Sequence, residues 1–185
     1  IPFAGMLVCP ILANEGLPNM PKGYMAEAAK IVHLAGGVFM ADEVQAGLCR
    51  TGMWWGYQMM DVVPDIVTMG KPLGGGIPLA ATAASTEITE TFRRHTRYFN
   101  TCASIPVQAA AGNAVLDIIE QDNLQENVTT VGHFLHERFL QIQQKHKTIG
   151  DVRGHGLFRG LEFVTDLKSK TPDKKAAVRV VNALK

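Results

Sequence analysis

Short apolar runs alternate with a helix-like segment in the first part of the chain, and this alternation restricts the fold more than any other feature. The segment 24–35 places apolar residues at helical spacing and ends at two glycines. The apolar runs cover residues 3–12, 38–41, 65–69 and 79–84. Strands that alternate with helices form mostly parallel sheets with helices on both faces. The sequence therefore predicts an α/β fold.

The later part of the chain has a different pattern. Pro106 suits the first turn of a helix that runs to Gln121, and residues 125–146 form a second helical stretch. Residues 157–164 are typical of a strand, and a last helix is expected from Pro172. A short helix is expected over residues 87–94. We predict a first domain at residues 1–125. A connecting helix and the start of a small α+β domain follow at 126–185.

Composition excludes several classes of function. With 46% apolar and 19% charged residues in a chain of 185, the protein is expected to be globular. A net charge of +1 argues against a nucleic-acid surface. Cys9, Cys49 and Cys102 are widely spaced and include no C-x-x-C pair, so we expect no metal site and a cytoplasmic location. The apolar start, residues 1–13, is too short to span a bilayer, and whether a targeting segment precedes it stays open.

Two charged residues come at or just after the ends of two of the predicted strands. Asp42 closes the run 38–41, and Lys71 follows the run 65–69, just before Gly74-Gly75-Gly76. Open α/β sheets bind ligands at the carboxyl ends of their strands. A lysine amine and a carboxylate are what pyridoxal phosphate (PLP) chemistry needs, because the amine bonds to the cofactor aldehyde and the carboxylate keeps the ring nitrogen protonated. An isolated lysine would usually be a surface residue, but this position favours an active-site role.

The motifs around these two residues resemble one known family. They are Ala41-Asp42-Glu43-Val44-Gln45-Ala46-Gly47, Arg50-Thr51-Gly52, Pro64-Asp65-Ile66-Val67-Thr68-Met69-Gly70-Lys71, Phe99-Asn100-Thr101 and Val152-Arg153-Gly154-His155-Gly156-Leu157-Phe158. In this order they resemble the class III aminotransferases of PLP fold type I. They look most like the branch of alanine–glyoxylate aminotransferases and of the phospho-lyases that act on phosphoethanolamine and phosphohydroxylysine. Several ordered motifs with matching spacings are a specific signal.

The resemblance implies an enzyme that uses pyridoxal 5'-phosphate to move an amino group from an amino acid or amine to a keto acid. Lys71 and Asp42 would be catalytic and would also bind the cofactor. Gln45 would hydrogen-bond the ring oxygen of the cofactor. Thr101 would reach the cofactor phosphate of a neighbouring subunit, which implies a homodimer with shared active sites. Val44 either packs on the ring or belongs to the core, and the sequence leaves both open.

Departures from the family pattern keep two alternatives in view. Family members are much longer, so we expect an internal piece of a larger enzyme that is inactive alone. Cys9-Pro10 stands where many relatives have Glu-Pro, Cys49 replaces a glycine, and residues 101–106 differ from the usual phosphate-site sequence. One alternative is a phospho-lyase that uses the same lysine. The other is a non-catalytic fragment or interaction domain. Glu43 and Arg50 are candidates for a pair that braces the loop, to which we assign no catalytic role because exposed pairs are weak.

Overall fold

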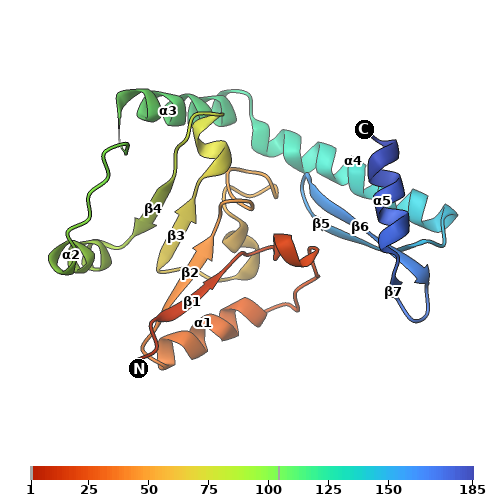
Figure 1. Cartoon of the computed structure of the whole chain (residues 1–185), viewed down its shortest axis with the longest axis horizontal. Helices are drawn as coiled ribbons and strands as arrows, with labels where there is room; N and C mark the ends of the chain where they lie inside the picture. Colours follow the sequence, from red (N-terminus) through yellow and green to blue (C-terminus); the bar gives the residue numbers. More distant parts are fainter. Residues whose placement is uncertain (1, 104) are drawn as a thin grey trace.

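Two sheets organise the chain, and the computed structural model describes them over residues 2–103 and 105–185 (Figure 1). The first sheet has the order β1-β2-β3-β4, and the second has the order β5-β6-β7. The strands are β1 (Gly5–Val8), β2 (Val38–Asp42), β3 (Ile66–Met69), β4 (Ala81–Ala84), β5 (Ile149–His155), β6 (Phe158–Asp166) and β7 (Thr171–Pro172). The helices are α1 (Tyr24–Leu34), α2 (Thr86–His95), α3 (Pro106–Gln121), α4 (Leu124–Lys145) and α5 (Lys174–Ala183). Short 3-10 turns are η1 (Ala13–Glu15), η2 (Gly56–Met60) and η3 (Lys71–Gly74).

The first sheet is mostly parallel, as predicted. Strands β1, β2 and β3 run parallel, and β4 pairs antiparallel with β3. The second sheet is antiparallel, and α4 leads from α3 to its first strand. The α/β class is therefore confirmed.

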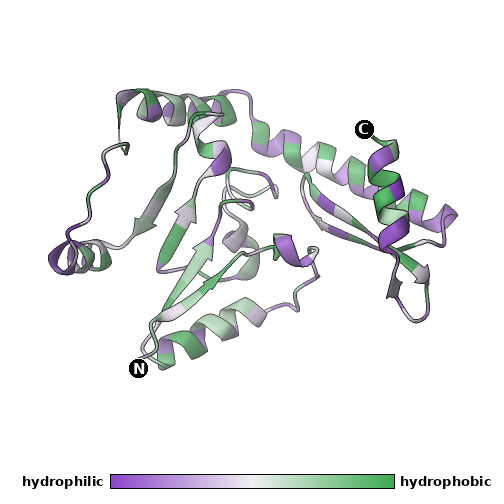
Figure 2. Cartoon of the chain, in the orientation of Figure 1, coloured by the Kyte–Doolittle hydropathy of each residue, from purple (hydrophilic) through white to green (hydrophobic). Residues whose placement is uncertain are grey.

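The core of the first sheet lies under α1. Met25, Ala29 and Val32 recur at helical spacing and pack on Phe39 of β2, which is 1% exposed. Burying an aromatic side chain of this size contributes about 2–3 kcal/mol to the hydrophobic free energy of folding. Figure 2 shows mainly hydrophobic residues along β1 and β2. The helix fixes β2, and β2 in turn carries Asp42 at its carboxyl end.

A carboxylate joins α1 to the start of β3. One oxygen of Asp65 accepts the backbone N–H of Phe39 at 2.7 Å and lies 2.7 Å from Nε2 of His33. Burial acts to raise the pKa of Asp65, but these hydrogen bonds outweigh it, and the net pKa is lowered. Asp65 therefore stays ionised, and its bond to Phe39 of β2 helps to hold β2 and β3 in register.

The first strand is shorter and less buried than predicted. It covers Gly5–Val8 instead of residues 3–12, and Leu7 is 58% exposed. The physical reason is its place at the edge of the sheet order, where only β2 pairs with it. Successive side chains of a strand point to opposite faces, so α1 shields only alternate residues of β1.

In the second part of the chain, the helices were predicted better than the strands. Helix α3 has the predicted bounds, and α4 differs from its predicted range by one residue at each end. Strand β5 was missed, because a register shift between Ile149 and Asp151 breaks its alternation of buried residues. The last helix begins at Lys174 instead of Pro172, which pairs in β7. The Asp173 side chain caps that helix by accepting the N–H of Ala176 at 2.9 Å.

The turn between β5 and β6 packs against the Arg50-Thr51-Gly52 segment. The N–H of Leu157 donates to the carbonyl of Arg50 at 3.2 Å. Gly156 has φ 52, and a Cβ there would lie 2.6 Å from the carbonyl carbon of Thr51. The Arg50 guanidinium lies 5.9 Å from the ring centroid of Phe158. Arg50 therefore serves this contact, and the predicted pairing with Glu43 was wrong.

Candidate active site

The parallel pairing of β2 and β3 brings Asp42 and Lys71 to one edge of the sheet. Asp42 is level with Thr68 in the register, and Lys71 begins η3 directly after β3 and Gly70. Figure 1 shows the two strands ending side by side, with the η3 turn beyond β3. This is the carboxyl edge, where open α/β sheets bind their ligands.

Lys71 has an unusual backbone conformation. Its φ of 44 lies in the left-handed region, which costs a residue with a side chain on the order of 1–2 kcal/mol. Strain of this kind concentrates at functional sites. The side chain is exposed, and its amine has no hydrogen-bond or ion-pair partner within residues 2–103 and 105–185. The amine is therefore available to an incoming group.

Asp42 is half-buried and oriented by its own loop. Its Oδ1 accepts the N–H of Val44 at 3.1 Å, which is a local turn typical of aspartate. Across the described residues no partner is found for Oδ2, so one oxygen remains for a ligand. The side chain of Val44 faces the lysine segment, because a Cβ at Gly70 would lie 3.9 Å from Val44 Cγ2. Val44 thus lies close to the segment that carries Lys71.

Gln45 and Thr101 have different surroundings. The amide of Gln45 donates to Oδ1 of Asn14 at 3.3 Å, which links the site to the turn after β1. Thr101 is exposed in the connection between α2 and α3, and its Oγ1 lies 3.7 Å from Sγ of Cys102. This connection follows β4, on the side of the sheet away from β1 (Figure 1). No hydrogen bond among the described residues joins Thr101 to Asp42 or Lys71.

The three departures from the family pattern, at Cys9, Cys49 and residues 101–106, lie in different surroundings. Cys49, which replaces a glycine, still adopts the left-handed conformation with φ 64 and is 1% exposed. The glycine-type backbone is therefore kept despite the side chain. Cys9 is half-buried. Within the stretch 101–106, Ser104 lies outside the described residues.

One buried residue of the site was not predicted from the sequence. Glu43 is 2% exposed, and its two carboxylate oxygens accept the N–H groups of Gly56 and Tyr57 at 2.7 and 2.8 Å. Burial raises the pKa of Glu43 most, the two hydrogen bonds lower it, and the charge of Asp42 raises it further. Strand alternation was the available signal, because neighbours of a half-buried residue point to opposite sides.

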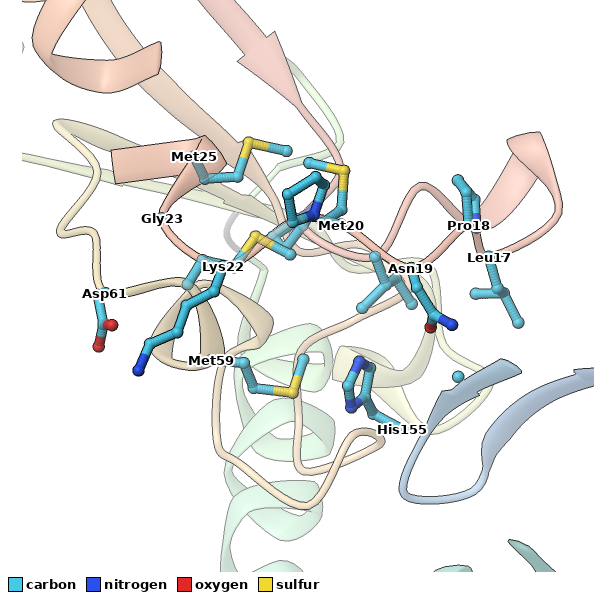
Figure 3. Close-up of a pocket in the computed structure, with 15 residues that line it drawn as sticks. Leu17, Pro18, Asn19, Met20, Lys22, Gly23, Met25, Met59, Asp61 and His155 are labelled. Atoms are coloured by element: carbon cyan, nitrogen blue, oxygen red, sulfur yellow. The ribbon is translucent and has the colours of Figure 1, made fainter. Parts of the chain in front are cut away.

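A cavity of about 320 Å³ is lined by a different set of residues (Figure 3). Loop 17–23 lines one side, and Met59 and His155 lie across from it, so the cavity is enclosed partly by η2 and partly by the end of β5. None of the predicted site residues lines it. Its lining includes Lys22 and Asp61 besides thioethers and prolines, but neither of these charged residues follows a strand of the sheet. We therefore place the candidate site by its chemistry, at the sheet edge.

The donor set at the edge fits the cofactor that the resemblance implies. An amine and a carboxylate oxygen that have no partner among the described residues, with an apolar side chain close to the lysine segment, match an aldehyde, a ring nitrogen and a ring face. These groups belong to Lys71, Asp42 and Val44. Gln45 adds an amide beside them. Among the described residues there is no cluster of three or more metal-ligating side chains, and no helix is long and apolar enough to cross a membrane.

Comparison with known proteins points to one family. Residues 2–184 match the model of the family described as aminotransferase class-III. An alanine–glyoxylate aminotransferase 2 homolog, named mitochondrial, from Arabidopsis thaliana is 44% identical over 183 residues, which are 99% of this chain and 38% of that protein. The chain thus spans well under half the length of this relative.

Solved structures of two similar enzymes superimpose on most of the chain. A phospholyase from Arthrobacter in complex with phosphoethanolamine superimposes with a TM-score of 0.87 at 42% identity, over 90% of this chain and 40% of that one. A taurine:2-oxoglutarate aminotransferase from Bifidobacterium kashiwanohense, in complex with PLP and glutamate, gives a TM-score of 0.84 at 28% identity. This match covers 90% of this chain and 38% of that one.

Proposed function

The chain belongs to the class III aminotransferase family, and we propose that it supplies the lysine and the carboxylate of a PLP-dependent transaminase. The enzyme would move an amino group from an amino acid or amine to a keto acid. One observation carries the proposal: Asp42 ends β2, Lys71 follows the adjacent parallel strand β3 at the same edge, and the Lys71 amine, on a strained backbone, has no partner among the described residues. The activity is proposed for the complete protein.

The proposed roles follow from the contacts of each side chain. When bound, PLP supplies an aldehyde for an amine and a pyridinium ring that accepts electrons. Lys71 would bond to the aldehyde and, once released, move a proton at the substrate Cα. Asp42 would hold the proton on the ring nitrogen. Val44 would pack on the ring face, and Gln45 would hydrogen-bond the ring oxygen.

A phospho-lyase is the second candidate, and the 42% identity to the Arthrobacter phospholyase favours it. The same lysine would serve an elimination that releases phosphate from a phosphorylated amino alcohol or amino acid. Incubating the complete protein with alanine plus glyoxylate, and separately with phosphoethanolamine, distinguishes the two. We expect glycine in the first mixture and no free phosphate in the second. Phosphate without glycine would identify a lyase, and neither product would favour a non-catalytic chain.

We propose a homodimer in which Thr101 serves the cofactor phosphate of the partner subunit. Support comes from the exposure of Thr101 and from its lack of described contacts with Asp42 or Lys71 in its own chain. An isologous interface would deliver each threonine to the opposite site.

Mixing two inactive variants tests this arrangement. A heterodimer of Lys71→Ala and Thr101→Ala subunits has one site with both lesions and one with neither. After subunit exchange we expect roughly a quarter of wild-type activity, because about half of the dimers are mixed and each has one intact site. The unmixed variants are the controls. Exchange shown by differently tagged subunits, without recovered activity, would place Thr101 in its own chain's site or in none.

Two broader expectations remain proposals. We propose a domain boundary near residue 125, supported by the separate sheets on either side of α4. We also propose a reducing compartment, supported by three free cysteines. The Arabidopsis relative is named mitochondrial, so a cytoplasmic location stays a prediction that fractionation of cells can test.

A further inference from the structure

Glu43 is a buried carboxylate whose partners are backbone groups of a distant turn. It follows Asp42 directly, and both of its oxygens accept N–H groups from the turn at Gly56 and Tyr57. A carboxylate that accepts hydrogen bonds at both oxygens is held in both position and rotation. The two N–H groups thus fix the orientation of the side chain next to Asp42.

The backbone of Glu43 joins the other half of the site. Its N–H donates to the carbonyl of Thr68 at 2.8 Å, three residues before Lys71. Its own carbonyl accepts the N–H of Gly47 at 2.9 Å. One residue therefore contacts the strand that leads to the lysine, the loop that follows Gln45, and the turn at residue 56.

The turn at Gly56 packs so closely on residues 43–46 that no side chain fits between them. A Cβ at Gly56 would lie 2.6 Å from Cβ of Ala46 and 3.3 Å from Oε2 of Glu43. Cβ atoms are essentially never that close to another carbon, so only glycine fits here without a shift. The carboxylate of Glu43 is the polar counterpart of this close approach, because it satisfies the two N–H groups that the turn buries.

We propose that Glu43 is a positioning residue for the Asp42 carboxylate. By holding residues 55–57 against residues 42–45, Glu43 fixes the peptide between itself and Asp42. That peptide sets the direction of the Asp42 side chain and its bond to the Val44 N–H. The inference rests on the proposed function, because the direction matters only if Asp42 faces a cofactor ring nitrogen.

The geometry requires a carboxylate and not an amide. Glutamine at this position has one acceptor oxygen, and its NH₂ group would face the second N–H. Two donors would then meet in a buried place, and one N–H would lose its partner. Glu43→Gln therefore tests the contact with little change of volume. Glu27→Gln is the matched control, because Glu27 lies on the exposed side of α1 and, among the described residues, its side chain pairs with Lys30 alone.

The first measurement uses the complete protein without cofactor. Amide hydrogen exchange of Gly56 and Tyr57 is expected to speed up about tenfold in Glu43→Gln, the size expected from one lost hydrogen bond to a charged group. The Glu27→Gln control should exchange like the wild type. If Glu43→Gln does not fold, Glu43→Asp keeps the charge but shortens the reach, and the same loss of protection is expected.

The second measurement uses the protein loaded with PLP. In the Glu43 variant we expect a shift in the pH at which the bound cofactor's absorbance changes. We also expect kcat about tenfold lower, with little change of KM for the amino donor. Faster exchange with an unchanged absorbance titration and unchanged kcat would show that Glu43 only stabilises the loop and would overturn the inference. Unchanged amide exchange of Gly56 and Tyr57 in the Glu43 variant would also overturn it. If the wild type takes up no cofactor, the proposed function itself fails, which is a different result.

Discussion

Replacing Lys71 with alanine in the complete protein is expected to abolish covalent attachment of PLP and to lower turnover by about 10⁴-fold, near the upper limit for a positioned acid–base group. Lys71 combines three properties on which this expectation depends. It begins η3 just after the carboxyl end of β3, it has a left-handed backbone, and its amine has no partner among the described residues. The absorbance of bound cofactor and the rate of amino transfer are the two measurements.

Lys22→Ala is the matched control for this prediction. Lys22 lies in the loop before α1, and its side chain lines the cavity, which none of the predicted site residues line (Figure 3). We expect this variant to keep both cofactor attachment and turnover. Attachment and turnover retained in Lys71→Ala but lost in Lys22→Ala would move the chemistry to the cavity and refute the site.

Replacing Asp42 with asparagine is expected to lower turnover by on the order of a hundredfold or more, comparable to the loss of one strong electrostatic contribution. Asparagine keeps the size and the acceptor for the Val44 N–H but removes the charge that would hold a proton on the ring nitrogen. Cofactor attachment through Lys71 should persist. Steady-state kinetics and absorbance, measured on the same preparation, separate these two effects.

Asp61→Asn provides the control for Asp42. Asp61 is exposed after η2 and has φ 50, a conformation that asparagine also tolerates. Turnover should be unchanged in this variant. Near-normal turnover of Asp42→Asn, with the control also normal, would mean that another group keeps the ring nitrogen protonated.

Elements with a regular spacing of apolar residues could be predicted from the sequence. Elements held by long-range contacts could not. Helices α1 and α3 follow from helical spacing, from the glycines after α1 and from Pro106 at the start of α3. Strand β5 escaped prediction because its register shifts after Ile149. The start of α5 was placed too early, since Pro172 continues into β7. Prolines suit both helix starts and edge strands, so the residue alone does not decide.

The placement of the candidate site residues was partly predictable for the same reason. Asp42 and Lys71 each follow a short apolar run, and adjacent parallel strands place such residues at one edge. The role of Glu43 depends on a turn 13 residues away, which no local pattern shows. The contact between Gln45 and Asn14 is also long-range. Thr101 was predicted only from resemblance, and the role proposed for it would need a second subunit.

Borohydride reduction of the complete protein with PLP, followed by peptide mapping, tests the central claim most directly. Reduction makes the bond between lysine and cofactor permanent, so the modified residue can be identified by mass. We predict a single pyridoxyl group on Lys71 in the wild type and none in Lys71→Ala. A pyridoxyl group on Lys22 or on any other lysine of the wild type, with Lys71 unmodified, would contradict the account.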